Sequence, residues 1–95
     1  MRILASFYYG QLFYQEGNFR KTIEIIEPII VDYQSYPYTP KLLSCFNLIG
    51  VATHCETEYN VSRFFYETAL KIAMENDEKY YYAFEYNNIA LTYIE

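Results

Sequence analysis

The residue pair most suggestive of chemistry in this chain is His54 followed by Cys55. Such a pair could form a nucleophilic Cys–His couple or supply two ligands to a metal ion. Both residues lie in a stretch with helical periodicity, where neighbouring side chains point about 100° apart and cannot face each other. His54 is the only histidine, and no Cys-x-x-Cys pattern offers further ligands. We therefore predict no catalytic residue, no metal site and no cofactor, and we expect His54 to line the core or a binding surface.

Acidic pairs such as Glu24 with Glu27 could be imagined as a general acid and a general base, and Glu56 with Glu58 is a second such pair. These pairs lie on stretches that are predicted to face solvent, which favours solvated helix surface over catalysis. The three glycines form no phosphate-binding loop, because neither Gly-x-Gly-x-x-Gly nor Gly-Lys-Ser/Thr occurs. We predict that the protein is not an enzyme.

Composition and charge narrow the class of partner. The 95 residues fit a single domain, 1–95, and a hydrophobic content of 53% argues against disorder. A net charge of −5 with scattered basic residues predicts no nucleic-acid partner and no anionic membrane surface. No apolar run approaches the ~20 residues of a membrane span. Cys45 and Cys55, about 15 Å apart along one helix, cannot form a disulfide, which favours a reducing, cytoplasmic location.

Helical periodicity and capping signals predict five helices and no sheet. We expect the helices over residues 2 to about 15, 19 to about 33, 40 to about 55, from the N-cap Glu58 or Asn60 to about 75, and from 78 to near the end of the chain. Short links between them require neighbouring helices to run antiparallel. The signals for helix ends are Gly17 followed by the N-cap Asn18, Thr39 followed by Pro40, and Asp77 as the N-cap of the last helix.

Three small residues recur inside these helices at a spacing of forty: Gly10, Gly50 and Ala90. Glycine inside a helix costs about 1 kcal/mol relative to alanine, so its regular recurrence indicates a structural repeat. Twelve residues after each glycine stands another small residue, Thr22 or Ser62, which would let the two helices of one hairpin approach closely. Ala90 has no such partner. The chain thus divides into repeat one, 1–36, repeat two, 37–76, and the first helix of a truncated third repeat, 77–95.

This pattern resembles the tetratricopeptide-repeat (TPR) family, whose units carry Leu-Gly and Tyr in the first helix and Ala-x-x-x-Phe in the second. The matching residues of repeat one are Tyr9, Gly10, Phe13, Gly17, Phe19, Thr22 and Ile26. Those of the later units are Phe46, Ile49, Gly50, Tyr59, Ser62, Tyr66 and Ala69, then Tyr86, Ile89, Ala90 and Tyr93. The chain departs from the family in its period of forty, where about 34 is usual, and in lacking the closing proline of each unit.

The resemblance implies an all-α fold of antiparallel helix hairpins, stacked into a right-handed superhelix of five helices. The first helix of each unit would line a concave, peptide-binding groove. The groove residues that the resemblance implies are Phe7, Gln11, Tyr14, Asn47, Val51, His54, Phe84, Asn87 and Leu91. No lysine or arginine stands at the positions that clamp a C-terminal carboxylate in one branch of the family. Amides and aromatic rings suit instead the backbone and side chains of an extended or helical peptide.

The resemblance therefore implies a non-catalytic module that binds a protein or peptide ligand. It is similar to the sensory and regulatory repeat arrays of larger bacterial signalling proteins. Two alternatives stay open, an oligomerisation module and a scaffolding subunit of an enzyme. Self-association is expected to use Tyr86, Ile89 and Tyr93, which would pack on a helix that this chain lacks, so that a homodimer forms through the C-terminal helix.

Overall fold

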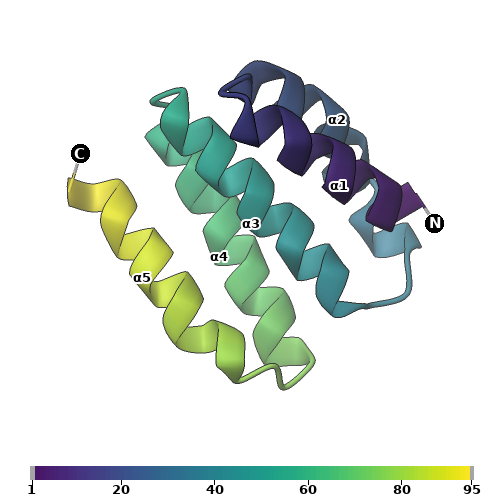
Figure 1. Ribbon diagram of the computed structural model, residues 1–95. Helices are drawn as coiled ribbons and strands as arrows, with labels where there is room; N and C mark the ends of the chain where they lie inside the picture. The colour runs from purple at the N-terminus through teal and green to yellow at the C-terminus, as the bar shows by residue number, and fades with distance from the viewer. Residues whose placement is uncertain (1, 95) are drawn as a thin grey trace.

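The computed structural model describes residues 2–94, which form α-helices and contain no β-strand. The elements are α1 (Arg2–Gln15), α2 (Phe19–Val31), the short 3₁₀ helix η1 (Tyr33–Ser35), α3 (Pro40–Cys55), α4 (Tyr59–Glu75) and α5 (Tyr80–Ile94). Successive α-helices run antiparallel, with α1, α3 and α5 in one layer and α2 and α4 behind them (Figure 1). The predicted all-α class, with five helices in antiparallel hairpins, is confirmed for the described residues. None of these helices is both long enough and apolar enough to cross a membrane.

The core is built around α3, which packs against α1, α2 and α4. It buries apolar side chains on several sides, and the isoleucines of α2 and the small residues of α4 close over them. The largest fully buried apolar side chains are Ile26, Ile29, Leu43, Phe46 and Ile49. The helix α5 differs from the others, because its buried residues Glu85, Asn88 and Thr92 are all polar.

The predicted close contacts within the hairpins are confirmed. The Thr22 hydroxyl donates a hydrogen bond to the Gly10 carbonyl at 2.9 Å, which joins α2 to α1. The Ser62 hydroxyl donates to the Gly50 carbonyl at 2.8 Å, which joins α4 to α3 in the same way. All four residues are buried, whereas Ala90 on α5 is exposed. The small residues therefore allow the facing helix to approach closely and also form a hydrogen bond with it.

The helices α1, α3 and α4 all end in the same kind of turn. The turn residues Gly17, Thr57 and Asp77 adopt left-handed conformations, with φ of 81°, 60° and 55°. In each turn the next residue's amide donates to the carbonyl five positions earlier at 2.9 Å, the Schellman arrangement that satisfies carbonyls at a helix end. The prediction that Asp77 caps the last helix is therefore wrong. Asp77 forms the turn, and α5 begins at Tyr80 instead of Glu78.

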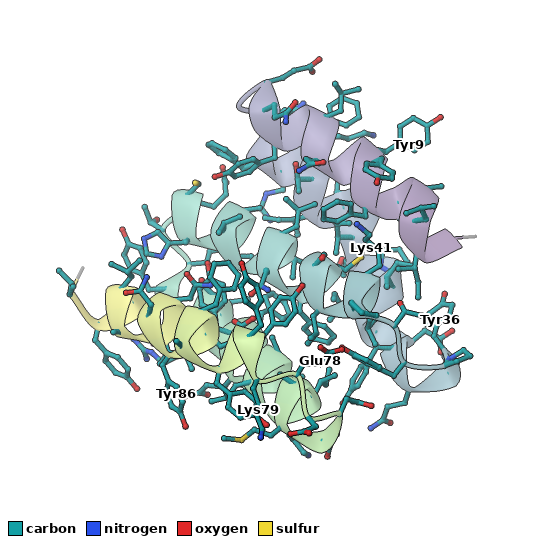
Figure 2. All side chains as sticks on the ribbon, turned by 60° about the horizontal axis from the view of Figure 1, so that its bottom comes forward. Tyr9, Tyr36, Lys41, Glu78, Lys79 and Tyr86 are labelled. Carbon is teal, nitrogen blue, oxygen red and sulfur yellow. The ribbon has the colours of Figure 1, made fainter. Side chains whose placement is uncertain are left out.

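The two links that precede α3 and α5 are joined to each other. The Tyr38 hydroxyl donates to the Glu78 carboxylate at 2.6 Å, across forty residues of sequence. Figure 2 shows Glu78 on the turn before α5, directed toward the link before α3. Burial, together with this carboxylate, raises the pKa of Tyr38 well above its ordinary value. This bond ties the turn before α5 to the link before α3, in addition to the packing of α5 on α4.

Candidate ligand-binding groove

Two adjoining hollows lie on the groove face, which we define as the face formed by α1, α3 and α5. The Phe84 hollow has a volume of about 440 Å³ and is lined by Phe7, Tyr14, Ser44, Asn47, Leu48, Val51, Tyr80, Tyr81 and Phe84. The His54 hollow has a volume of about 180 Å³ and is lined by Tyr14, Val51, His54, Cys55, Tyr66, Asn88 and Leu91. Tyr14 and Val51 border both hollows, so the two lie next to each other in one depressed region of this face, which we call the depression.

Most of the predicted groove residues border this depression. They are Phe7, Tyr14, Asn47, Val51, His54, Phe84 and Leu91, whereas Gln11 and Asn87 line neither hollow. Asn87 lies on an exposed part of α5, next to the buried Asn88 that does reach the His54 hollow. The structure therefore brings most of the predicted residues of α1, α3 and α5 to the same hollows, and on α5 the bordering asparagine is Asn88 instead of Asn87.

A cation, which the sequence analysis did not place here, reaches one end of the depression. The ammonium group of Lys41, in the first turn of α3, lies 4.6 Å from the centre of the Phe7 ring and 5.4 Å from that of Tyr8. These are cation–π distances. A lysine head group therefore already rests against an aromatic ring at the edge of the groove face.

A buried carboxyl group that the sequence analysis missed lies next to Asn47 and Asn88, which border the two hollows. Glu85 has a relative exposure of 0%, and neither of its carboxylate oxygens has a hydrogen-bond partner among the described residues. Burial raises the pKa of Glu85 to about 7. The side-chain amides of Asn47 and Asn88 approach the carboxylate and oppose this rise, but neither completes a hydrogen bond of good geometry.

The hydroxyl of Tyr66 lies in the same environment. Burial raises the pKa of Tyr66 to about 12, and the charge of Glu85 adds to the rise, while a hydrogen bond with Ser62 opposes it. Glu85, Asn47, Asn88 and Tyr66 come from three helices, α5, α3 and α4. We call the first three residues the Glu85 cluster, since together they contain all the buried side-chain N and O atoms found without a partner in the described part of the chain.

His54 and Cys55 both border the His54 hollow. The His54 ring meets Tyr59 edge-on, with ring centres 5.0 Å apart. Between residues 2 and 94, no three His, Cys, Asp or Glu side chains gather closely enough to hold a metal ion. The environment of His54 is that of a ring packed in a groove wall.

The residues predicted for self-association lie on the flank of α5 that faces away from the groove. Tyr86 is 55% exposed and projects outward from α5 (Figure 2), and Ile89 is partly buried. Tyr93 is 65% exposed, but the guanidinium of Arg63 stacks over its ring at 3.7 Å. Arg63 also donates to the Thr92 side chain at 2.8 Å and to the Thr92 carbonyl at 3.1 Å. One face of Tyr93 is thus already covered from within the chain.

A third hollow lies on the opposite side of the fold, between α2 and α4. This Phe64 hollow has a volume of about 610 Å³ and is lined by Glu27, Ile30, Val31, Tyr33, Phe46, Phe64, Phe65, Glu67, Thr68 and Lys71. Its polar lining is charged at the rim, whereas the groove face combines rings, amides and a buried carboxyl group.

No family model, no curated protein and no solved structure matches this chain.

Proposed function

We propose that this chain is a tetratricopeptide-like module that binds a segment of another protein along its groove face and does no catalysis of its own. The observation that carries the proposal is the pair of adjoining hollows lined mainly by α1, α3 and α5. Equivalent hairpins, joined by the same glycine–hydroxyl contact, support a repeat architecture. By analogy with the resembling family, we place the module in the regulatory part of a larger bacterial signalling protein in the cytoplasm.

The chemistry of the groove face suits a peptide. The Phe84 hollow falls in the size range of ligand sites, which are largely apolar with a few placed polar groups. Its rings, Phe7, Tyr81 and Phe84, offer apolar and aromatic contact to side chains. The amide of Asn47 offers a donor and an acceptor to a peptide backbone.

Photo-crosslinking tests this proposal. We expect the crosslinker p-benzoylphenylalanine, placed at Phe84, to capture a protein from the source cell, and mass spectrometry to return one peptide segment. Phe64 is the matched control, because it is also exposed but lies in the hollow between α2 and α4. Asn47→Ala should lower the yield at Phe84 without loss of helical circular dichroism. Equal capture at both positions, or capture at Phe64 alone, would contradict binding in the groove.

Self-association through α5 is the second proposal, favoured by the exposed side chains of Tyr86 and Tyr93. Light scattering at high micromolar concentration should then give a mass above that of the monomer. Tyr86→Lys should restore the monomer, because a charge would have to be buried in the interface. Tyr9→Lys, which changes an equally exposed tyrosine on α1, is the matched control. A strict monomer at this concentration would overturn the idea.

A further inference from the structure

The Glu85 cluster leaves four buried polar atoms without a partner among the described residues. They are the two carboxylate oxygens of Glu85, the amide oxygen of Asn47 and the amide nitrogen of Asn88. Buried polar groups in folded proteins are nearly all hydrogen-bonded, and an unpaired buried charge is especially costly. Within the cluster the Asn47 and Asn88 amides approach the Glu85 carboxylate without completing hydrogen bonds of good geometry, so its polar atoms keep the capacity to bond to a further group.

The cluster is placed where a ligand can reach it. Asn47 borders the Phe84 hollow and Asn88 borders the His54 hollow, whereas Glu85 borders neither. Both amides approach the Glu85 carboxylate, so a ligand group would reach it past Asn47 and Asn88. The helix α5, which carries Glu85, packs chiefly against α4 rather than α3.

The cations whose contacts the structure gives are engaged elsewhere. Lys41 rests on the Phe7 ring, and Arg63 is held by Thr92 and Tyr93. Arg20 pairs with acidic side chains in the turn between α3 and α4. None of these contacts supplies a counter-charge to Glu85, and the net charge of −5 favours a cationic ligand overall.

We propose that the Glu85 cluster binds a primary alkylammonium group, as carried by a lysine side chain of the bound segment. An ammonium group has three N–H donors, and the cluster offers three unpartnered acceptor oxygens, two from Glu85 and one from Asn47. The lysine stem would lie along the apolar wall formed by Leu48 and Val51. This inference rests on the proposed function, because it names the side chain that the groove selects.

An NMR titration with n-butylammonium chloride tests the site without knowledge of the natural ligand. On ¹⁵N-labelled protein, at a pH above 7, we expect saturable shifts of the side-chain amide signals of Asn47 and Asn88. Glu85→Gln should weaken binding about tenfold or more, since it removes the charge-assisted hydrogen bonds. Glu75→Gln removes the same charge from the exposed end of α4 and should leave binding unchanged.

Two further measurements keep the inference falsifiable. Asn47→Leu, which removes the third acceptor at similar size, should also weaken binding, and the spectrum itself reports whether each variant is folded. n-Butanol carries the same apolar stem without the charge and should give no saturable shift. Equal effects of butanol and butylammonium, or binding that survives Glu85→Gln, would overturn the ammonium site.

A peptide arm separates the site from the proposed function. The peptide acetyl-Ala-Leu-Lys-Leu-Ala-amide should bind about tenfold more tightly than its norleucine counterpart, because only lysine places a charge at Glu85. Butylammonium binding without any gain from the lysine peptide would support the ammonium site, identify its ligand as a small amine and count against peptide binding. Crosslinking at Phe84 without butylammonium binding would keep the groove and overturn the Glu85 site.

Discussion

Replacing Gly50 with leucine is expected to unfold the domain. A side chain at this position in α3 would run into the ring of Tyr66, whose atoms lie within contact distance of even a single added carbon. Tyr66 is 3% exposed and cannot swing into solvent, and the bond from Ser62 to the Gly50 carbonyl holds α4 against α3. Overpacking of a core costs about 1–3 kcal/mol and occasionally more. That is a large share of the about 5–15 kcal/mol by which a domain is stable. Circular dichroism and a thermal melt measure the loss.

The equivalent glycine of the first hairpin gives the matched comparison. An added carbon at Gly10 would meet Ile26 side-chain carbons at 3.0 Å and a Leu48 methyl group at 3.1 Å, so these neighbours need to give by only a few tenths of an ångström. Gly10→Ala should therefore be close to neutral, since alanine also gains helix propensity. Gly50→Ala should destabilise, and adding Tyr66→Leu should restore part of the loss. An unchanged melting temperature in Gly50→Leu would contradict the close packing of α3 on α4.

The helices could be predicted because each is specified by local signals. The spacing of Gly10, Gly50 and their hydroxyl partners indicated the hairpins, and the structure adds the hydrogen bonds that this spacing allows. The start of α5 was missed for a physical reason. Aspartate is both a good N-cap and one of the few residue types that tolerate a left-handed conformation, so Asp77 fits either role locally. Only the packing of α4 decides between them.

The candidate site was predicted in outline and missed at its centre. Helical spacing placed rings and amides on one face, but Glu85 was not among the predicted residues, and glutamate is almost never fully buried unless paired. The forty-residue period carried the missing signal. Glu85, Asn88 and Thr92 stand in register with three residues of α3 that are buried as well: Cys45, Leu48 and Ala52. Polar residues at positions that are buried in the preceding repeat are therefore a sequence signal for such a cluster.

Raising the pH from about 5 to about 8 is expected to lower the stability of the protein through Glu85. The pKa of this carboxyl group is about 7 in the fold, against an ordinary value of 4.5. Below a pH of about 4.5, Glu85 is protonated in both the folded and the unfolded state, and its contribution to stability is fully present. Between the two values the folded state holds the proton that the unfolded chain has released, so stability falls as the pH rises. The difference between these two pKa values corresponds to a loss of about 3 kcal/mol in the free energy of unfolding.

Glu85→Gln should flatten this pH dependence and raise the melting temperature at about pH 8, since a neutral amide replaces a buried charge. The groups that face Glu85 are the amides of Asn47 and Asn88 and the un-ionised hydroxyl of Tyr66, so none of them titrates in this window. Thermal melts at both pH values measure the effect, with His54→Gln as the control for the only histidine. A slope that persists in Glu85→Gln would show that another group is responsible.

The same variant connects stability to binding. A ligand that binds only the folded state stabilises it by RT ln(1 + [L]/Kd), so n-butylammonium should recover at about pH 8 part of the stability that ionised Glu85 removes. At about pH 5 the carboxyl group is protonated in the fold, and the same ligand should have little effect. In Glu85→Gln the ligand should have little effect at either pH. If n-butylammonium raises the stability of the wild-type protein and of Glu85→Gln equally, the cation acts on the protein as a salt. The pH effect would then be unrelated to the proposed ammonium site.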